Sequence, residues 1–99
     1  MNQNLPFEVL RQLRAQGKTL ATAESCTGGL IGKLLTDVPG SSEVYMGGVI
    51  SYTNGVKHRL LGVSEDTLRV YTAVSRQTAH EMARGAREAV QADIGVSVT

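Results

Sequence analysis

The residues best suited to chemistry in this sequence lie in the segment TAESCTGG, residues 22–29. A short predicted strand leads into this turn and a predicted helix follows it, so Ser25 is lifted clear of the sheet. The first N–H groups of a helix lack partners within the helix, and the helix dipole adds positive potential there. Such a turn holds an oxyanion or a phosphate, and Gly28 and Gly29 let the backbone approach a ligand. The local pattern alone favours a simpler interpretation, in which Ser25 or Thr27 caps the helix and the glycines only turn the chain.

A serine nucleophile needs a base to take its proton. The candidates are His58, His80 and Lys57, although each, as an isolated residue, is more typical of an exposed helix position. A lysine becomes a base when burial lowers its pKa and leaves the amine neutral. Lys57 comes just after the predicted strand that contains Tyr52. It would therefore lie at the sheet edge from which Ser25 emerges if the two strands are neighbours.

Three further residues have alternative interpretations. Cys26 is a second candidate nucleophile, because a helix N-terminus lowers the pKa of a thiol, but most lone cysteines are small buried side chains. Glu24 would orient a base or a substrate, or else form a local salt bridge. Tyr52 is a proton relay or, more commonly, a residue of the core or rim. The segment thus offers two candidate nucleophiles, Ser25 and Cys26, and the residues alone neither choose between them nor exclude a simple helix cap.

Composition limits the class of protein. The 99 residues are enough for one small domain. Ten basic and nine acidic residues give a net charge of +1, which argues against a general nucleic-acid binder. One cysteine and two widely separated histidines give no metal-ligand spacing. No apolar run approaches the roughly 20 residues of a membrane span, and the N-terminus lacks a secretory signal pattern, so we expect a cytoplasmic protein.

The elements that must position these residues follow from the spacing of apolar side chains. We expect a helix over residues 6–17, with proline in its first turn and glycine at its end, and a short strand over 18–23. Apolar residues at helical spacing predict a second helix over 30–38. Residues 44–53 are the strongest strand candidate because they are rich in β-branched and aromatic side chains. The pair Gly47-Gly48 within them indicates a bulge or a close backbone approach.

The second half of the chain alternates in the same way. Asn54-Gly55 is a hairpin signal, but the next residues have helical spacing and end in glycine, so we prefer a short helix capped by Asn54. Ser64 is expected to cap another turn, and Ser75 a longer helix. Residues 93–99 predict a final strand that should pair inside a sheet. The alternation predicts an α/β fold in which helices flank a largely parallel or mixed sheet.

Several blocks together resemble the CinA C-terminal domain family, in matching order over about residues 5–99. The blocks are TAESCTGGL at 22–30, TDVPGSS at 36–42, GGVISYTN at 47–54 followed by Lys57 and LGV at 61–63, AVS at 73–75, EMA at 81–83 with Gly85-Ala86, and ADI at 92–94 through Val98-Thr99. Any one block is weak evidence, whereas the set is highly specific.

The resemblance implies a three-layer α/β/α domain that hydrolyses the carboxamide of nicotinamide mononucleotide to nicotinic acid mononucleotide and ammonia. It places the nucleophile at Ser25 and its partner at Lys57, with Tyr52 beside them. It also places Thr27, Gly28 and Gly29, together with Cys26 and Glu24, around the substrate. It implies a small-molecule nucleotide substrate and neither a metal nor an organic cofactor.

The family continues beyond the match to residues 98–99, so we expect residues 1–99 to be the N-terminal portion of the domain. Its partial sheet would have a free edge, which promotes self-association, and we expect a homo-oligomer. The alternative is a non-catalytic fragment of the family that binds nucleotide or only oligomerises.

Overall fold

The computed structural model describes residues 4–99. Its elements are α1 (Leu5–Gln16), β1 (Leu20–Glu24), α2 (Leu30–Thr36), a 3₁₀ turn (Ser41–Glu43), β2 (Tyr45–Ile50), α3 (Asn54–Leu61), α4 (Glu65–Tyr71), α5 (Arg76–Val90) and β3 (Ile94–Val98). Every element expected from the apolar spacing is present, with ends displaced by a few residues. None of the helices within residues 4–99 combines the length and the apolar character that a membrane span requires.

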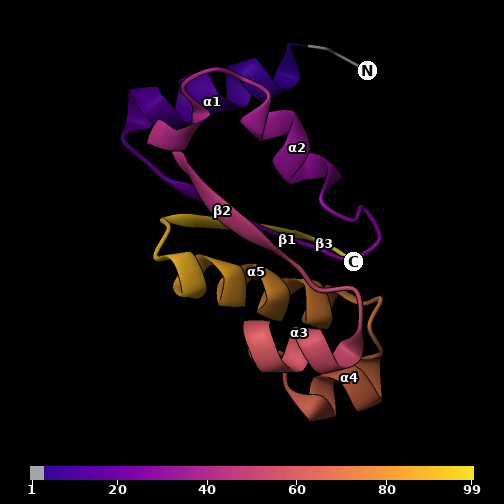
Figure 1. Ribbon diagram of the computed structural model, residues 1–99. Coiled ribbons are helices and arrows are strands. Elements are labelled where there is room, and N and C mark those ends of the chain that lie inside the picture. Colours follow the sequence, from indigo (N-terminus) through magenta and orange to yellow (C-terminus); the bar gives the residue numbers. More distant parts are fainter. Residues whose placement is uncertain (1–3) are drawn as a thin grey trace.

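The three strands form one sheet in the order β2-β1-β3, and both pairings are parallel. Figure 1 shows α1 and α2 on one face of this sheet and α5, backed by α3 and α4, on the other. The predicted three-layer α/β/α fold is therefore confirmed, and of the parallel and mixed alternatives the described sheet is parallel. The parallel arrangement brings the carboxyl ends of all three strands to one edge of the sheet.

Strand β1 is the centre of the molecule, and all five of its residues are buried. Because side chains alternate along a strand, β1 supplies both cores. Ala21 and Ala23 pack on the α5 side with Met82 and Val63, whereas Leu20 packs with the leucines of α1 and α2 on the other side. A strand buried on both faces holds the residue that follows it in a fixed position, and that residue is Ser25.

Helix α3 begins one residue earlier than the sequence suggests. Its N-cap is Thr53, whose hydroxyl accepts the N–H of Val56 at 3.3 Å, and Asn54 is already helical. The expectation that Asn54 caps the helix is therefore wrong. The cap falls at Thr53 because this residue is extended, so its side chain reaches the third N–H of the helix. The preference for a helix over a hairpin is confirmed, as are the caps at Ser64 and Ser75.

The close backbone approach expected at Gly47-Gly48 is confirmed at Gly48, and a bulge lies directly before the pair, at Met46. The register between β1 and β2 shifts after Leu20, which pairs with Tyr45, while Ala21 pairs with Gly47, so Met46 is an extra residue. A Cβ atom at Gly48 would overlap the Thr22 hydroxyl. Glycine at this position thus lets β2 approach β1 closely.

Strand β3 lies at an edge of the described sheet and pairs only with β1. Ser97 turns toward α5, where its hydroxyl donates to the Ala79 carbonyl oxygen at 2.6 Å. Ile94 and Val96 lie on the opposite face and remain 38% and 43% exposed. The sequence led us to expect this strand inside a sheet, but β3 lies at the edge of the sheet that residues 4–99 form. Homo-oligomer formation stays a prediction.

Helices α3 and α5 cross closely at Gly85, and this contact gives a test of the packing. A Cβ atom at Gly85 would overlap the backbone carbonyl of Leu61, which cannot rotate away. We expect Gly85→Ala to lower the free energy of unfolding by about 1–3 kcal/mol, as overpacking does. Gly55→Ala is the matched control, because its nearest neighbour is the mobile Arg59 guanidinium at 3.6 Å. Urea unfolding of both variants measures the difference, and equal stability would contradict the close crossing.

Candidate active site

The connections that follow β1 and β2 leave the sheet on opposite faces. The chain passes from β1 to α2 on one face and from β2 to α3 on the other, although the two strands are neighbours (Figure 1). In open α/β sheets a crevice forms where adjacent connections diverge in this way, and ligands bind there, outside the carboxyl ends of the strands. Ser25 follows β1 directly and Lys57 lies in the first turns of α3, so both lie just beyond the carboxyl ends of these two neighbouring strands.

The structure brings Ser25 and Lys57 into contact beyond the ends of β1 and β2. The Lys57 Nζ atom lies 2.9 Å from Ser25 Oγ and 2.8 Å from the carbonyl oxygen of Ser51. The backbone N–H of Ser25 donates to the Val98 carbonyl oxygen at 2.9 Å, which ties the turn to β3. Two side chains that are far apart in the sequence are thus held at hydrogen-bond distance by all three strands.

Lys57 is buried almost completely, with 1% of its surface exposed. Within residues 4–99 no carboxylate forms an ion pair with it. Burial lowers the pKa of the Lys57 amine below its ordinary value of 10.5, while the nearby Cys26 side chain acts in the opposite direction. A buried amine without a counter-ion favours its neutral form, and a neutral amine has a lone pair that can accept a proton.

The carboxylate of Glu24 is engaged with the start of α2. One oxygen accepts the N–H groups of Gly29 and Ile31 at 3.1 and 3.0 Å, and the other accepts the Gly32 N–H at 2.9 Å. Burial acts to raise the pKa of Glu24, but the N–H donors, led by Gly32, outweigh it and lower the pKa below 4.5. Glu24 therefore caps the helix and is only 3% exposed. The local salt bridge considered from the sequence is not among the contacts that Glu24 makes within residues 4–99.

The turn between Ser25 and α2 keeps two N–H groups without a partner. The Gly28 N–H donates to the Ser25 carbonyl oxygen at 3.1 Å, whereas within the described residues no hydrogen bond involves the N–H of Cys26 or Thr27. Cys26 is exposed and Thr27 is half-buried. The Thr27 hydroxyl makes no hydrogen bond of good geometry in residues 4–99, although it contributes to the lowered pKa of Glu24. Of the N–H groups of Cys26, Thr27 and Gly28, the first two are thus free within residues 4–99 and the third is engaged.

Tyr52 and Ser51 adjoin the Ser25–Lys57 pair, and the sequence pointed to Tyr52 but not to Ser51. Tyr52 is 75% exposed, and its hydroxyl makes no hydrogen bond within residues 4–99. Ser51, which sequence reasoning missed, is fully buried, and its N–H donates to the Glu24 carbonyl oxygen at 2.7 Å. A small polar residue at the end of an apolar strand is the one signal that marks Ser51, and that signal is weak.

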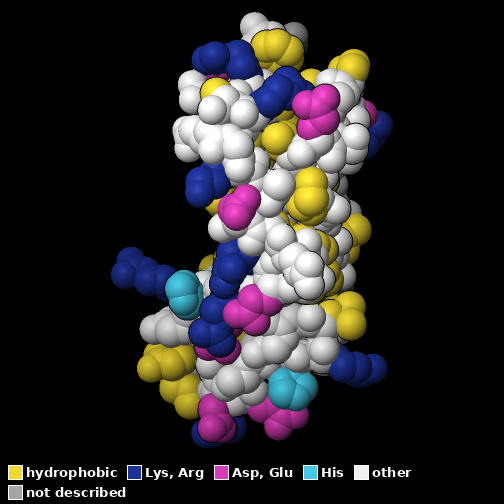
Figure 2. Space-filling view, turned by 90° about the vertical axis from the view of Figure 1, so that its left-hand side faces the viewer, with side chains coloured by type: hydrophobic (Ala, Val, Ile, Leu, Met, Phe, Trp, Pro, Cys, Tyr) yellow, Lys and Arg dark blue, Asp and Glu magenta, His cyan; other side chains and the backbone are white. Residues whose placement is uncertain are grey.

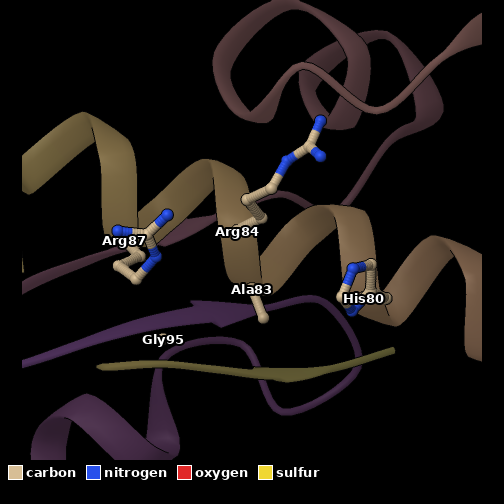
Figure 3. A pocket seen from close by; sticks show the side chains of 5 residues that line it. All are labelled: His80, Ala83, Arg84, Arg87 and Gly95. Atoms are coloured by element: carbon tan, nitrogen blue, oxygen red, sulfur yellow. The ribbon is translucent and has the colours of Figure 1, made fainter. Parts of the chain in front are cut away.

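The two histidines do not join the pair. The Nδ1 atom of His58 lies 2.8 Å from the Val63 carbonyl oxygen, and its Nε2 atom faces Glu65 at 3.6 Å. His80 is exposed on α5 and lines a separate surface pocket of about 290 Å³ with Arg84, Arg87, Ala83 and Gly95. Figure 3 shows that the basic side chains of this pocket do not converge on one point. Neither histidine is therefore placed to serve Ser25.

No group of three or more metal-ligating side chains lies together in the part of the chain that the structure describes. Basic and acidic side chains are interspersed over the face of the molecule seen in Figure 2, as the small net charge leads one to expect. What supports proton transfer around Ser25 is the buried Lys57 amine at 2.9 Å from its hydroxyl.

The fold and the site define a three-layer α/β/α domain with a buried serine–lysine contact at the carboxyl edge of its sheet. The family model described as the CinA C-terminal domain matches residues 2–99. The chain belongs to this family.

Several relatives are similar along most of the chain. A CinA-like protein of Leptospira interrogans is 56% identical over 94 residues, which cover 94% of this chain and 22% of that protein. The competence/damage inducible protein CihA of Agrobacterium tumefaciens is 44% identical, with a TM-score of 0.88 over 92% of this chain and 55% of that one. A CinA superfamily structure from Escherichia coli is 37% identical, with a TM-score of 0.96 over 98% of this chain and 56% of that one. The chain thus spans under a quarter of the curated relatives and just over half of these solved ones.

Proposed function

We propose that this chain is an amidohydrolase in which Ser25 is the nucleophile and Lys57 the general base. One observation supports this reaction class above the others: the buried Lys57 amine lies 2.9 Å from Ser25 Oγ and has no carboxylate partner in residues 4–99. We further propose that the substrate is nicotinamide mononucleotide, whose carboxamide yields nicotinic acid mononucleotide and ammonia. The motif resemblance supports this choice of substrate.

The hydrogen bonds of Lys57 orient its amine for the first step. One N–H donates to the Ser51 carbonyl oxygen, so the lone pair of the neutral amine is free to face the Ser25 hydroxyl. Lys57 takes the hydroxyl proton as Ser25 Oγ attacks the carboxamide carbon. The N–H groups of Cys26 and Thr27 are the proposed donors to the oxyanion that forms, and one such donor contributes about 3–4 kcal/mol in known cases.

The tetrahedral intermediate then collapses into an ester. The carbon–nitrogen bond breaks, and the Lys57 ammonium returns its proton to the leaving nitrogen, which departs as ammonia. Lys57 next takes a proton from a water molecule that attacks the ester carbon. The carboxylic acid product leaves, Ser25 regains its proton, and the neutral amine is restored. Tyr52, which adjoins Ser51, is proposed as a proton relay at the mouth of the site, and the mechanism needs no cofactor.

Ammonia release tests the proposal. We expect the chain to release ammonia from nicotinamide mononucleotide and more slowly from free nicotinamide, which lacks the ribose phosphate. Mass spectrometry of quenched reactions should show an acyl group on the peptide that contains Ser25. The absence of both ammonia and acylated peptide would contradict the proposal.

Cys26→Ala separates the two candidate nucleophiles in the same assay. Cys26 supplies a backbone N–H to the proposed oxyanion site, and alanine keeps that group. We therefore expect kcat within about threefold of the unmodified chain, because the donor to the oxyanion is retained. A loss of turnover together with an acyl group on Cys26 in the parent protein would make the thiol the nucleophile.

A further inference from the structure

Glu24 has a buried carboxylate beside Ser25 and Lys57, and the proposed mechanism gives this charged group no role. It directly precedes Ser25, and its two oxygens hold the N–H groups of Gly29, Ile31 and Gly32 at 2.9–3.1 Å. These three donors lie on the far side of the Ser25–Gly29 turn. The side chain of Glu24 therefore closes the turn by joining the residue before it to its last residue and to the first turn of α2.

The backbone of Glu24 reaches the other half of the site. Its carbonyl oxygen accepts the N–H of Ser51 at 2.7 Å, and the Ser51 hydroxyl lies 3.4 Å from the same oxygen. The carbonyl oxygen of Ser51 in turn accepts the Lys57 amine at 2.8 Å. Glu24 is thus hydrogen-bonded both to the turn that holds Ser25 and to the loop that orients Lys57.

The charge of Glu24 also decides which N–H groups remain free. The start of a helix attracts anions, and here the carboxylate already satisfies that attraction. Of the N–H groups from Ser25 to Gly32, those of Cys26 and Thr27 are the two without a partner within residues 4–99, and they adjoin Ser25. An oxyanion that forms on a Ser25 adduct is then directed to this turn instead of to the start of α2.

We propose that Glu24 is a positioning residue: its carboxylate fixes the Ser25–Gly29 turn against α2, so that the Ser25 hydroxyl, the Lys57 amine and the N–H groups of Cys26 and Thr27 keep one arrangement. This role rests on the proposed function. It differs from a substrate contact, because both carboxylate oxygens are engaged within the protein. The predicted substrate-binding role of Glu24 would act on KM, whereas a positioning role acts on kcat.

Glu24→Gln tests the role with little change of shape. The amide keeps one acceptor oxygen but presents an NH₂ group to a backbone N–H, so the turn loses one of its anchors. We expect kcat to fall about 10–100-fold with KM nearly unchanged, since a small misplacement of reacting groups costs about that much. A fluorophosphonate probe should label Ser25 more slowly by a similar factor, which reports on the nucleophile without any turnover.

Glu81→Gln is the matched control. The Glu81 carboxylate accepts the Ser64 N–H at 2.8 Å and the Thr67 hydroxyl at 2.6 Å, so it also anchors the start of a helix, but it has no bond to either reacting residue. We expect Glu81→Gln to lower the melting temperature while leaving kcat and Ser25 labelling unchanged. Equal loss of labelling in both variants, or unchanged kcat and labelling in Glu24→Gln, would overturn the inference.

Two further measurements keep the test decisive. If Glu24→Gln does not fold, Glu24→Asp replaces it, because aspartate keeps the charge on a shorter side chain that cannot reach the same N–H groups. Full labelling of Ser25 in Glu24→Asp would show that these hydrogen bonds do not position Ser25, which overturns the inference. Ser25→Ala separates this inference from the proposed function. Full amidase turnover in Ser25→Ala would end the proposed function, whereas an inactive Ser25→Ala with a fully active Glu24→Gln would end only the role of Glu24.

Discussion

Ser25→Ala is expected to lower kcat for amide hydrolysis by about 10⁴–10⁶-fold, the range seen when a serine nucleophile is removed from an enzyme that acts through an acyl intermediate. The loss is large because no other described side chain lies at hydrogen-bond distance from the Lys57 amine. KM for nicotinamide mononucleotide should change little, since Ser25 is buried, at 8% exposed, and its hydroxyl acts on the reacting carbon only. Steady-state ammonia release at several substrate concentrations measures both constants.

Ser41→Ala provides a control with the same substitution at a serine of similar burial. Ser41 is 7% exposed and lies in the 3₁₀ turn that precedes β2, at the opposite end of that strand from the site. Its replacement should leave kcat unchanged. Turnover by Ser25→Ala within tenfold of Ser41→Ala would show that Ser25 is not the nucleophile.

Lys57→Met is the second large effect, and it should appear in both activity and stability. Methionine fills the space of the lysine stem but cannot accept a proton, so kcat should fall by about 10²–10⁴-fold, the usual contribution of a general base. In the unmodified chain, kcat/KM should rise with pH as the Lys57 amine loses its proton, because only the neutral form is the base. Lys33→Met is the control, since the Lys33 side chain is 70% exposed.

The stability of the same variants reports the protonation state of Lys57. Its pKa is lowered in the folded protein, so between that lowered value and the ordinary 10.5 the unfolded chain binds more protons than the folded one. The free energy of unfolding of the unmodified chain should therefore rise with pH across that window, by about 1.4 kcal/mol per unit of lowering. Lys57→Met should lose this rise and Lys33→Met should keep it. Identical pH profiles for the two variants would show that folding does not lower the pKa of Lys57.

Much of the secondary structure was predictable because it follows from local spacing and capping. Ser64 precedes residues typical of a capped turn, Ser75 precedes apolar residues at helical spacing, and both caps are present. The cap at Thr53 was missed because Asn54, also a good capping residue, stands next to it. Local sequence could not separate the two, since the backbone angle that decides the cap depends on how β2 delivers the chain to α3.

The sequence by itself determined the turn around Ser25, the order of helices and strands, and the candidate amine at Lys57. Only the tertiary structure decided that β1 and β2 are neighbours, that Lys57 is buried with its amine beside Ser25, and that Ser51 and Glu24 support the pair. The physical reason is that a pKa and a hydrogen bond depend on what surrounds a side chain. For Lys57 those surroundings are built from three strands and a helix that meet only in the folded chain.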